Sequence, residues 1–264
     1  NNKSAKKYKA REVLSEIAKA AWECGDPGVQ FDTTINNWHT CPNSGRITAS
    51  NPCSEYMHLD NSACNLASIN LMKFLDASGN FKVEEFKQAV RVFILAQEII
   101  VGSSSYPTER IAENARKFRE LGLGFANLGA MLMDKGIPYD SEAGFSWGAA
   151  ITSLMSGEAY RFSAEIAGRM KPFEGYAINR EPMLRVIENH SLASRRISQN
   201  NLTDKKLGAE AVNVWREALS LGEKNGFRNS QVTVIAPTGT ISFMMDCDTT
   251  GIEPDFSLVK MKQL

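Results

Sequence analysis

The chain has 264 residues, a formal net charge of zero at pH 7 and 43% hydrophobic residues. The balanced charge argues against a nucleic-acid-binding protein, and no apolar run reaches the roughly 20 residues that a membrane-spanning helix needs. The length allows a large core, and we expect one helix-rich domain with few strands over residues 1–264. Five cysteines without CxxC spacing favour a reducing compartment, so we expect a cytoplasmic protein.

Apolar residues recur at helical spacing along most of the chain, beginning with Ala10–Glu23. The same pattern predicts helices over Asn65–Leu75, Val83–Val101, Thr108–Lys135, Asp140–Ala167, Glu181–Ile187 and Lys205–Glu223. The helix predicted over Thr108–Lys135 contains three glycines, at positions 122, 124 and 129. Each costs roughly 1 kcal/mol relative to alanine inside a helix. We therefore expect another backbone to approach closely there.

Fewer segments have the composition of strands or loops. Phe31–Ser50 is rich in Asn, Thr, Ser and Gly and is predicted as a loop, as is the polar stretch Ser191–Asp204. The apolar, β-branched run Val232–Ala236 predicts a buried strand. Cys53–Leu59 is predicted to be strand-like, and Thr240–Met245 is either a second strand or the start of a helix.

The most informative stretch is Asn51-Pro52-Cys53-Ser54-Glu55, which sets an amide, a thiol and a carboxyl group on alternate residues. In an extended backbone these three side chains share one face and lie roughly 6–7 Å apart. A second thiol, Cys64, follows along the chain. A hydrogen-bonding amide, a sulfur capable of one-electron chemistry, a base and a spare thiol together suit radical chemistry on a hydroxylated substrate.

Several motifs, in order, resemble one enzyme family. Asn51–Met57 and Ala63–Leu71 closely resemble the catalytic large chain of ribonucleotide reductases. Four further stretches resemble the cobalamin-dependent branch of that family: Asp26–Thr34, Trp38–Asn43, Ala236–Ser242 and Asp246–Pro254. The resemblance runs nearly from end to end. It implies an α/β fold that is an internal portion of a ten-stranded α/β barrel, in which a finger loop carries the central cysteine.

The resemblance also implies a role for each residue of the motif. Cys53 would carry a thiyl radical that takes the 3′ hydrogen of the ribose, and Glu55 would be the base on the 3′-hydroxyl. Asn51 would hold the substrate hydroxyls through its amide. Cys64 would be one member of the reducing cysteine pair, with its partner upstream of this chain. The other three cysteines receive no catalytic role.

The segment after the strand predicted at Val232–Ala236 is expected to bind the substrate phosphates. A glycine lets the backbone come close to a ligand, and successive N–H groups with hydroxyls can hold a phosphate. The family resemblance implies the same use. The predicted substrate-binding residues are Ser50, Pro237, Thr238, Gly239, Thr240 and Ser242.

Cofactor and partners follow from the resemblance alone. Adenosylcobalamin would generate the radical, and the substrate would be a ribonucleotide, taken as the diphosphate although the sequence leaves the triphosphate open. A thioredoxin-like protein would supply electrons, nucleotide effectors would bind segments outside this chain, and the full-length form could be a homodimer. Asp246, Asp248, Glu253 and Asp255 lack EF-hand spacing, and the three histidines form no metal-binding pair, so no metal site is predicted.

Two alternatives remain open from the residues. One is a reductase of the same superfamily that takes its radical from a separate metal-bearing subunit. The other is a truncated, non-catalytic nucleotide-binding fragment. The chain does not begin with Met, and it stops at Lys260–Leu264 without Gly or Pro, so we expect an internal piece of a longer chain.

Overall fold

The computed structural model of the protein describes residues 6–255, 257 and 259, so the chain end at 260–264 lies outside it. The chain divides into two compact units, Asn1–Asn37 and Trp38–Leu264. The first contains helices α1 (Ala10–Cys24) and α2 (Asp32–Asn37). Helix α1 confirms the predicted helix, and α2 forms within a stretch predicted as loop. A short polar helix such as α2 has no apolar periodicity by which to recognise it.

The second unit is built on parallel strands. Strand β1 (Asn65–Asn70) pairs with β2 (Leu121–Ala126), with Asn65 opposite Leu121 and Asn70 opposite Ala126. Residues 231–236 run beside β2 in the same direction: Leu123 N donates to Val232 O at 3.1 Å, and Val234 N donates to Leu123 O at 3.0 Å. The buried strand predicted at Val232–Ala236 is confirmed only in part: the segment pairs with β2 through a single parallel bridge, Leu123–Thr233, and its residues alternate between buried and half-buried.

Both strands fall where helices were predicted. Asn65–Leu75 is β1 followed by the 3₁₀ helix η1 (Leu71–Phe74), and the predicted helix over 108–135 is α4 (Glu109–Phe118), β2 and α5 (Leu128–Asp134). Every residue of β2 is buried, so its sequence lacks the alternation that identifies a half-exposed strand.

The glycines explain why this strand can be so tightly enclosed. A Cβ on Gly124 would lie 2.7 Å from Val234 O, and one on Gly129 would lie 2.7 Å from Glu253 O. The predicted close approach of another backbone is therefore confirmed at these two glycines, in a strand and a short helix rather than in one long helix, whereas the close neighbours of Gly122 are side chains. Side chains at these two positions would force the neighbouring backbone outward.

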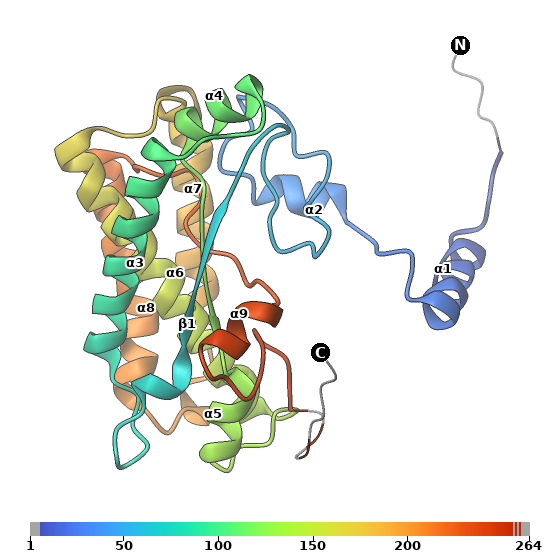
Figure 1. The fold of residues 1–264 in the computed structure, drawn as a ribbon, viewed down its shortest axis with the longest axis vertical. Helices are drawn as coiled ribbons and strands as arrows, with labels where there is room; N and C mark the ends of the chain where they lie inside the picture. The colour runs from blue at the N-terminus through green and yellow to red at the C-terminus, as the bar shows by residue number, and fades with distance from the viewer. Residues whose placement is uncertain (1–5, 256, 258, 260–264) are drawn as a thin grey trace. The chain divides into compact units, whose positions relative to one another are not determined.

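Long helices cover one face of the strands, and α9 (Gly239–Met244) lies on the other (Figure 1). The covering helices include α3 (Val83–Ser103), α6 (Glu142–Met170), α7 (Tyr176–Ser194) and α8 (Lys205–Asn225). They confirm the four helices predicted from apolar spacing in these regions. Helix α9 shows that the helical alternative for 240–245 is the right one, and the 3₁₀ helix η2 (Gln199–Asn201) interrupts the predicted loop at 191–204.

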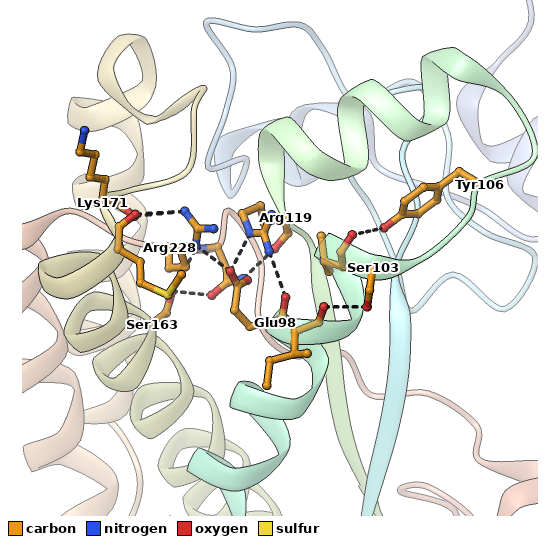
Figure 2. A network of polar contacts seen from close by, with 11 residues as sticks. Glu98, Ser103, Tyr106, Arg119, Ser163, Lys171 and Arg228 are labelled. Carbon is orange, nitrogen blue, oxygen red and sulfur yellow. Dashed lines mark hydrogen bonds and ion pairs between the residues drawn. The ribbon is translucent and has the colours of Figure 1, made fainter.

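A buried polar network ties α3 to the start of β2 (Figure 2). Glu98 Oε1 accepts hydrogen bonds from Arg119 Nε at 2.7 Å and Arg228 Nε at 2.6 Å, and Glu98 Oε2 accepts one from Asn229 Nδ2 at 2.7 Å. Such charge-assisted bonds are strong, and removing Glu98 would leave two largely buried guanidinium groups without their carboxylate partner. Arg119 lies two residues before β2, so the network connects this end of the strand to α3.

The fold is thus helix-rich α/β, as predicted. Within the part of the chain that the structure describes, no helix is long and apolar enough to cross a lipid bilayer.

Candidate active site

The segment that carries Cys53 is a tight loop. Asn51 O accepts the Ser54 N–H at 3.0 Å, and Asn51 also bonds Tyr56 twice: Asn51 N donates to Tyr56 O at 3.2 Å, and Tyr56 N donates to Asn51 Oδ1 at 3.0 Å. Cys53 is exposed at the tip. The strand predicted over Cys53–Leu59 is therefore wrong. The chain reverses at Ser54, whose φ of 64° is left-handed, so an extended backbone does not align the three motif side chains.

Some neighbours of Cys53 hold the loop in shape, and others carry groups that can take part in chemistry. Asn51 uses its amide oxygen to close the loop, which leaves its NH₂ group as the part that can donate to a hydroxyl. Ser50 Oγ donates to Asn51 O at 2.7 Å and so supports the loop from outside. Glu55 is half-buried, and its Oε2 is buried without a hydrogen-bond partner. A buried carboxylate oxygen in that state is costly unless a proton or hydroxyl reaches it.

The second predicted thiol, Cys64, lies directly before β1 and is half-buried. Burial raises the pKa of this thiol to about 12, and the negative charges of Glu120 and Glu55 act in the same direction. The structure therefore brings Glu55 and Cys64, which are nine positions apart in the sequence, into one electrostatic environment. At neutral pH the sulfur is held as a thiol rather than as a thiolate.

Sequence reasoning missed two buried residues beside Cys64. His58 Nδ1 lies 3.0 Å from Glu120 Oε1, and His58 Nε2 lies 3.1 Å from Ser230 Oγ. The two side chains lie within ion-pair distance, and neither His58 Nδ1 nor Glu120 Oε1 has a hydrogen-bond partner in the described structure. The available signal was Glu120 itself, a charged residue directly before a fully apolar run. We call Tyr56, His58, Cys64 and Glu120 the amino-edge cluster.

The predicted phosphate segment folds into a turn and the helix α9. Thr238 has a φ of 54°, and its Oγ1 accepts the Gly251 N–H at 2.5 Å. Ser242 is buried, and its Oγ donates to Gly239 O at 2.7 Å. These two hydroxyls serve the turn itself. Pro237 and Thr240 are exposed, and a Cβ on Gly239 would meet open space, so the outward-facing part is smaller than the predicted set.

Two asparagines, also missed from sequence, hold this segment at the carboxyl ends of the strands. Asn127 Nδ2 donates to Asn70 Oδ1 at 2.9 Å, Asn127 Oδ1 accepts the Thr249 N–H at 2.9 Å, and Asn70 Nδ2 donates to Met245 O at 3.3 Å. Asn70 ends β1 and Asn127 directly follows β2. We call Asn70, Asn127, Thr238 and Thr249 the carboxyl-edge contacts.

The whole chain, residues 1–264, matches the family model described as the ribonucleotide reductase barrel domain. The chain belongs to the ribonucleotide reductase family. It is 58% identical over 257 residues to a vitamin B12-dependent ribonucleotide reductase of Rhodopirellula baltica, and 54% identical over 259 residues to a protein of the same name from Streptomyces coelicolor. Each match covers 97% of this chain, but only 24% and 27% of the relative.

A more distant match extends the comparison. The chain is 34% identical over 249 residues to a vitamin B12-dependent ribonucleoside-diphosphate reductase of Mycobacterium tuberculosis, covering 94% of this chain and 30% of that protein. The chain thus spans about a quarter of the length of the curated relatives it matches.

In this ribonucleotide reductase chain, two of the histidines are held neutral. His39 Nδ1 accepts the Cys41 N–H at 3.3 Å and its Nε2 faces Gly45 O at 3.1 Å, which fixes the tautomer with the proton on Nε2. Burial and the proximity of His58 lower the pKa of His39 to about 4. Burial also lowers the pKa of His190 to about 4. Among the residues described, no three His, Cys, Asp or Glu side chains form a metal-binding group.

Proposed function

We propose that the protein carrying this chain reduces ribonucleotides to 2′-deoxyribonucleotides, with Cys53 as the radical-bearing residue. One observation carries the proposal: an exposed thiol stands at the tip of a hydrogen-bonded loop, two residues before a carboxylate with a buried, unpartnered oxygen. The family membership and the names of the relatives support the same chemistry.

Each proposed step uses a group of this chain. A thiyl radical on Cys53 takes the hydrogen atom from C3′ of the ribose, and Glu55 accepts the proton of the 3′-hydroxyl. The 2′-hydroxyl takes a proton from the thiol pair made of Cys64 and a partner cysteine outside this chain, and leaves as water. The same pair supplies two electrons and the hydrogen that C2′ gains, and it ends as a disulfide, while Glu55 returns its proton to the 3′-oxygen. Cys53 then returns its hydrogen atom to C3′, which regenerates the thiyl radical.

The relatives' names support adenosylcobalamin as the cofactor. When bound, this group supplies the one-electron oxidation of the Cys53 thiol through homolysis of its cobalt–carbon bond. The residues at the loop tip fit that use, because Pro52, Cys53 and Ser54 are all exposed and the sulfur can be approached from outside the loop. The role of the chain is to hold the sulfur in this accessible position.

We further propose that β1, β2 and residues 231–236 are part of a ten-stranded α/β barrel into which the Cys53 loop projects as a finger. Gly239 and Thr240 would face the substrate phosphates, supported by their exposure and by the first N–H groups of α9, which have no intrahelical acceptors. The name of the Mycobacterium tuberculosis relative favours a diphosphate substrate.

The remaining partners are proposals from the family. They are a thioredoxin-like reductant that reopens the disulfide, nucleotide effectors bound outside this chain, and a homodimer of the full-length form. We place the protein in the cytoplasm because its five cysteines form no CxxC pair and the proposed cycle needs a reducing compartment.

The test is deoxynucleotide formation by the full-length protein with a dithiol reductant, with and without adenosylcobalamin. We expect product only when the cofactor is added, with ribonucleoside diphosphates preferred over triphosphates. Product that forms without cobalamin but needs a second, metal-bearing subunit would support the other branch of the superfamily. Nucleotide binding without product under every condition would reduce the role of this chain to binding.

A further inference from the structure

The amino-edge cluster is assembled by strand register. Cys64 directly precedes β1 and Glu120 directly precedes β2, and the pairing of Asn65 with Leu121 places the two residues next to one another. The sulfur also reaches along β2, because a Cβ on Gly122 would lie 2.5 Å from Cys64 Sγ. In a strand, residues 120 and 122 point to the same side, so the carboxyl group and the sulfur occupy one face of β2.

Glu120 lies where burial of a carboxylate group costs free energy. It is 1% exposed, and neither of its oxygens has a hydrogen-bond partner in the described structure. Its partner at ion-pair distance is His58, which is 4% exposed and whose Nε2 lies 3.1 Å from Ser230 Oγ. Burial of such a pair is hard to explain by stability alone, since a hydrophobic pair of similar volume is often as stable or more so. The position beside Cys64 offers a reason for it.

We propose that His58 and Glu120 form a positioning pair for Cys64: Glu120 places a fixed negative charge beside the sulfur and keeps it a protonated thiol until it reacts, and His58 holds that charge in place. This inference rests on the redox role proposed for Cys64. Neither residue touches substrate in this role. The pair would prevent Cys64 from ionising between turnovers, when a thiolate would be open to alkylation and stray oxidation.

Other ionisable groups face the amino-edge cluster, and the pKa shifts around it agree with a negative charge on Glu120. Glu55, from the Cys53 loop, adds a second negative charge that raises the pKa of Cys64. The charge of Glu120 also contributes to the raised pKa of the Tyr56 hydroxyl, the Cys41 thiol and the Tyr106 hydroxyl, so these groups stay neutral around it. The nearest arginine along the chain, Arg119, donates hydrogen bonds from its guanidinium group to Glu98.

The experiment measures alkylation of Cys64 by iodoacetamide in the full-length protein between pH 7.5 and 9.5, located by mass spectrometry. In the wild type we expect the rate to rise about tenfold per pH unit without a plateau, because a pKa near 12 keeps the thiolate rare throughout. Glu120→Gln keeps the side-chain shape and removes the charge, so the rate at pH 8.5 should rise about tenfold for each unit by which the pKa falls.

Two controls make the result specific. Glu120→Asp retains the charge and should stay near the wild-type rate. Cys247, whose raised pKa comes from burial and from Asp248 and Asp246, should react equally in all variants. A Cys64 rate unchanged within about twofold in Glu120→Gln, or a wild-type plateau near the ordinary thiol pKa of about 8.5, would overturn the proposal.

If Glu120→Gln does not fold, the wild-type profile still tests the proposal, because a plateau near pH 8.5 would overturn it. The deoxynucleotide assay is separate from this one. If the protein forms no deoxynucleotide but Glu120→Gln still speeds alkylation of Cys64, the proposed function is wrong and the positioning pair stands. If the enzyme is active but Glu120→Gln has no effect on alkylation, the function stands and the positioning pair is wrong.

Discussion

The two ends of the same parallel strands differ in how their polar groups are satisfied. At the amino edge, buried side-chain atoms lack hydrogen-bond partners: Glu55 Oε2, His58 Nδ1 and both oxygens of Glu120, together with Asn65 Oδ1 and Gln97 Oε1. Within the described residues, the one other such atom is Trp147 Nε1 in α6. At the carboxyl edge, by contrast, Asn127 bonds to both Asn70 and Thr249 through its amide.

This difference indicates that the amino edge serves chemistry and the carboxyl edge serves stability. Unsatisfied buried groups reduce stability, and natural proteins retain them chiefly where chemistry needs them. A closed set of amide hydrogen bonds instead holds a segment in one conformation. We therefore expect changes at the amino edge to alter turnover with little loss of stability, and changes at the carboxyl edge to alter stability first.

The largest expected effect is at the tip of the Cys53 loop. Cys53→Ala should abolish deoxynucleotide formation, because no other atom of the loop can carry the proposed thiyl radical. Since the side chain is exposed, the free energy of unfolding should change by no more than about 0.5 kcal/mol. Product formation and urea unfolding on the same preparation check both statements. Retained turnover would remove Cys53 from the mechanism.

The next effect concerns the reducing thiol. Cys64→Ser should limit product to at most one turnover per chain under dithiol reductants, because serine cannot form the disulfide that closes the cycle. Cys247→Ser is the matched control, since Cys247 is also partly buried but lies on the carboxyl-edge segment. Quantifying product per chain over time tests the pair. Unimpaired cycling by the Cys64 variant would refute its redox role.

At the carboxyl edge the expected effect is on stability. Asn127→Ala removes two side-chain hydrogen bonds and places alanine at a φ of 72°, so we expect a loss of about 2–4 kcal/mol. Asn127→Gly loses the same bonds without the backbone strain and should be about 1 kcal/mol less destabilised. Denaturant unfolding measures both. Values for both variants within about 0.5 kcal/mol of wild type would contradict the role given to these contacts.

The smallest effect is an acid sensitivity of His39, whose ring packs edge-on against that of His58. His39 has a folded pKa of about 4 against an ordinary value of 6.5, so between these values the unfolded chain binds more protons than the folded one. The contribution of His39 to the free energy of unfolding should therefore be fully present above pH 6.5. It should fall towards pH 4 by up to about 1.4 kcal/mol per pH unit. Unfolding curves of wild type and His39→Gln from pH 7 to 4 isolate the contribution. Parallel pH profiles for the two would show that His39 is not responsible.

Helices with long apolar repeats could be predicted from the sequence because their periodicity is local. Helices α3, α6 and α8 begin within two residues of where the pattern placed them. The strands could not, because β2 is buried on both sides and its alternating glycines make sense only once Val234 and Cys64 are known to lie against them.

The residue roles in the site stay predictions. Cys53 and Glu55 belong to one short motif and Cys64 to a second motif further along the chain, so residue spacing and family resemblance could both point to them. The chain reversal at Ser54 was not foreseen, since a left-handed serine has no sequence signature. His58 and Glu120 are 62 positions apart: His58 lies in the loop before β1, Glu120 directly precedes β2, and the fold brings the two side chains to 3.0 Å. No local pattern in the sequence encodes that meeting.

The missing side chain at Gly122 has a consequence for how this chain can vary. The space above that glycine is taken up by the sulfur of Cys64 and by Leu66. A side chain at position 122 would therefore occupy the same space as the side chain at position 64, so a larger residue at one position requires a smaller residue at the other. Substitutions at the two positions should be non-additive in a double-mutant cycle, and any redesign of the thiol's surroundings has to treat them as a single unit.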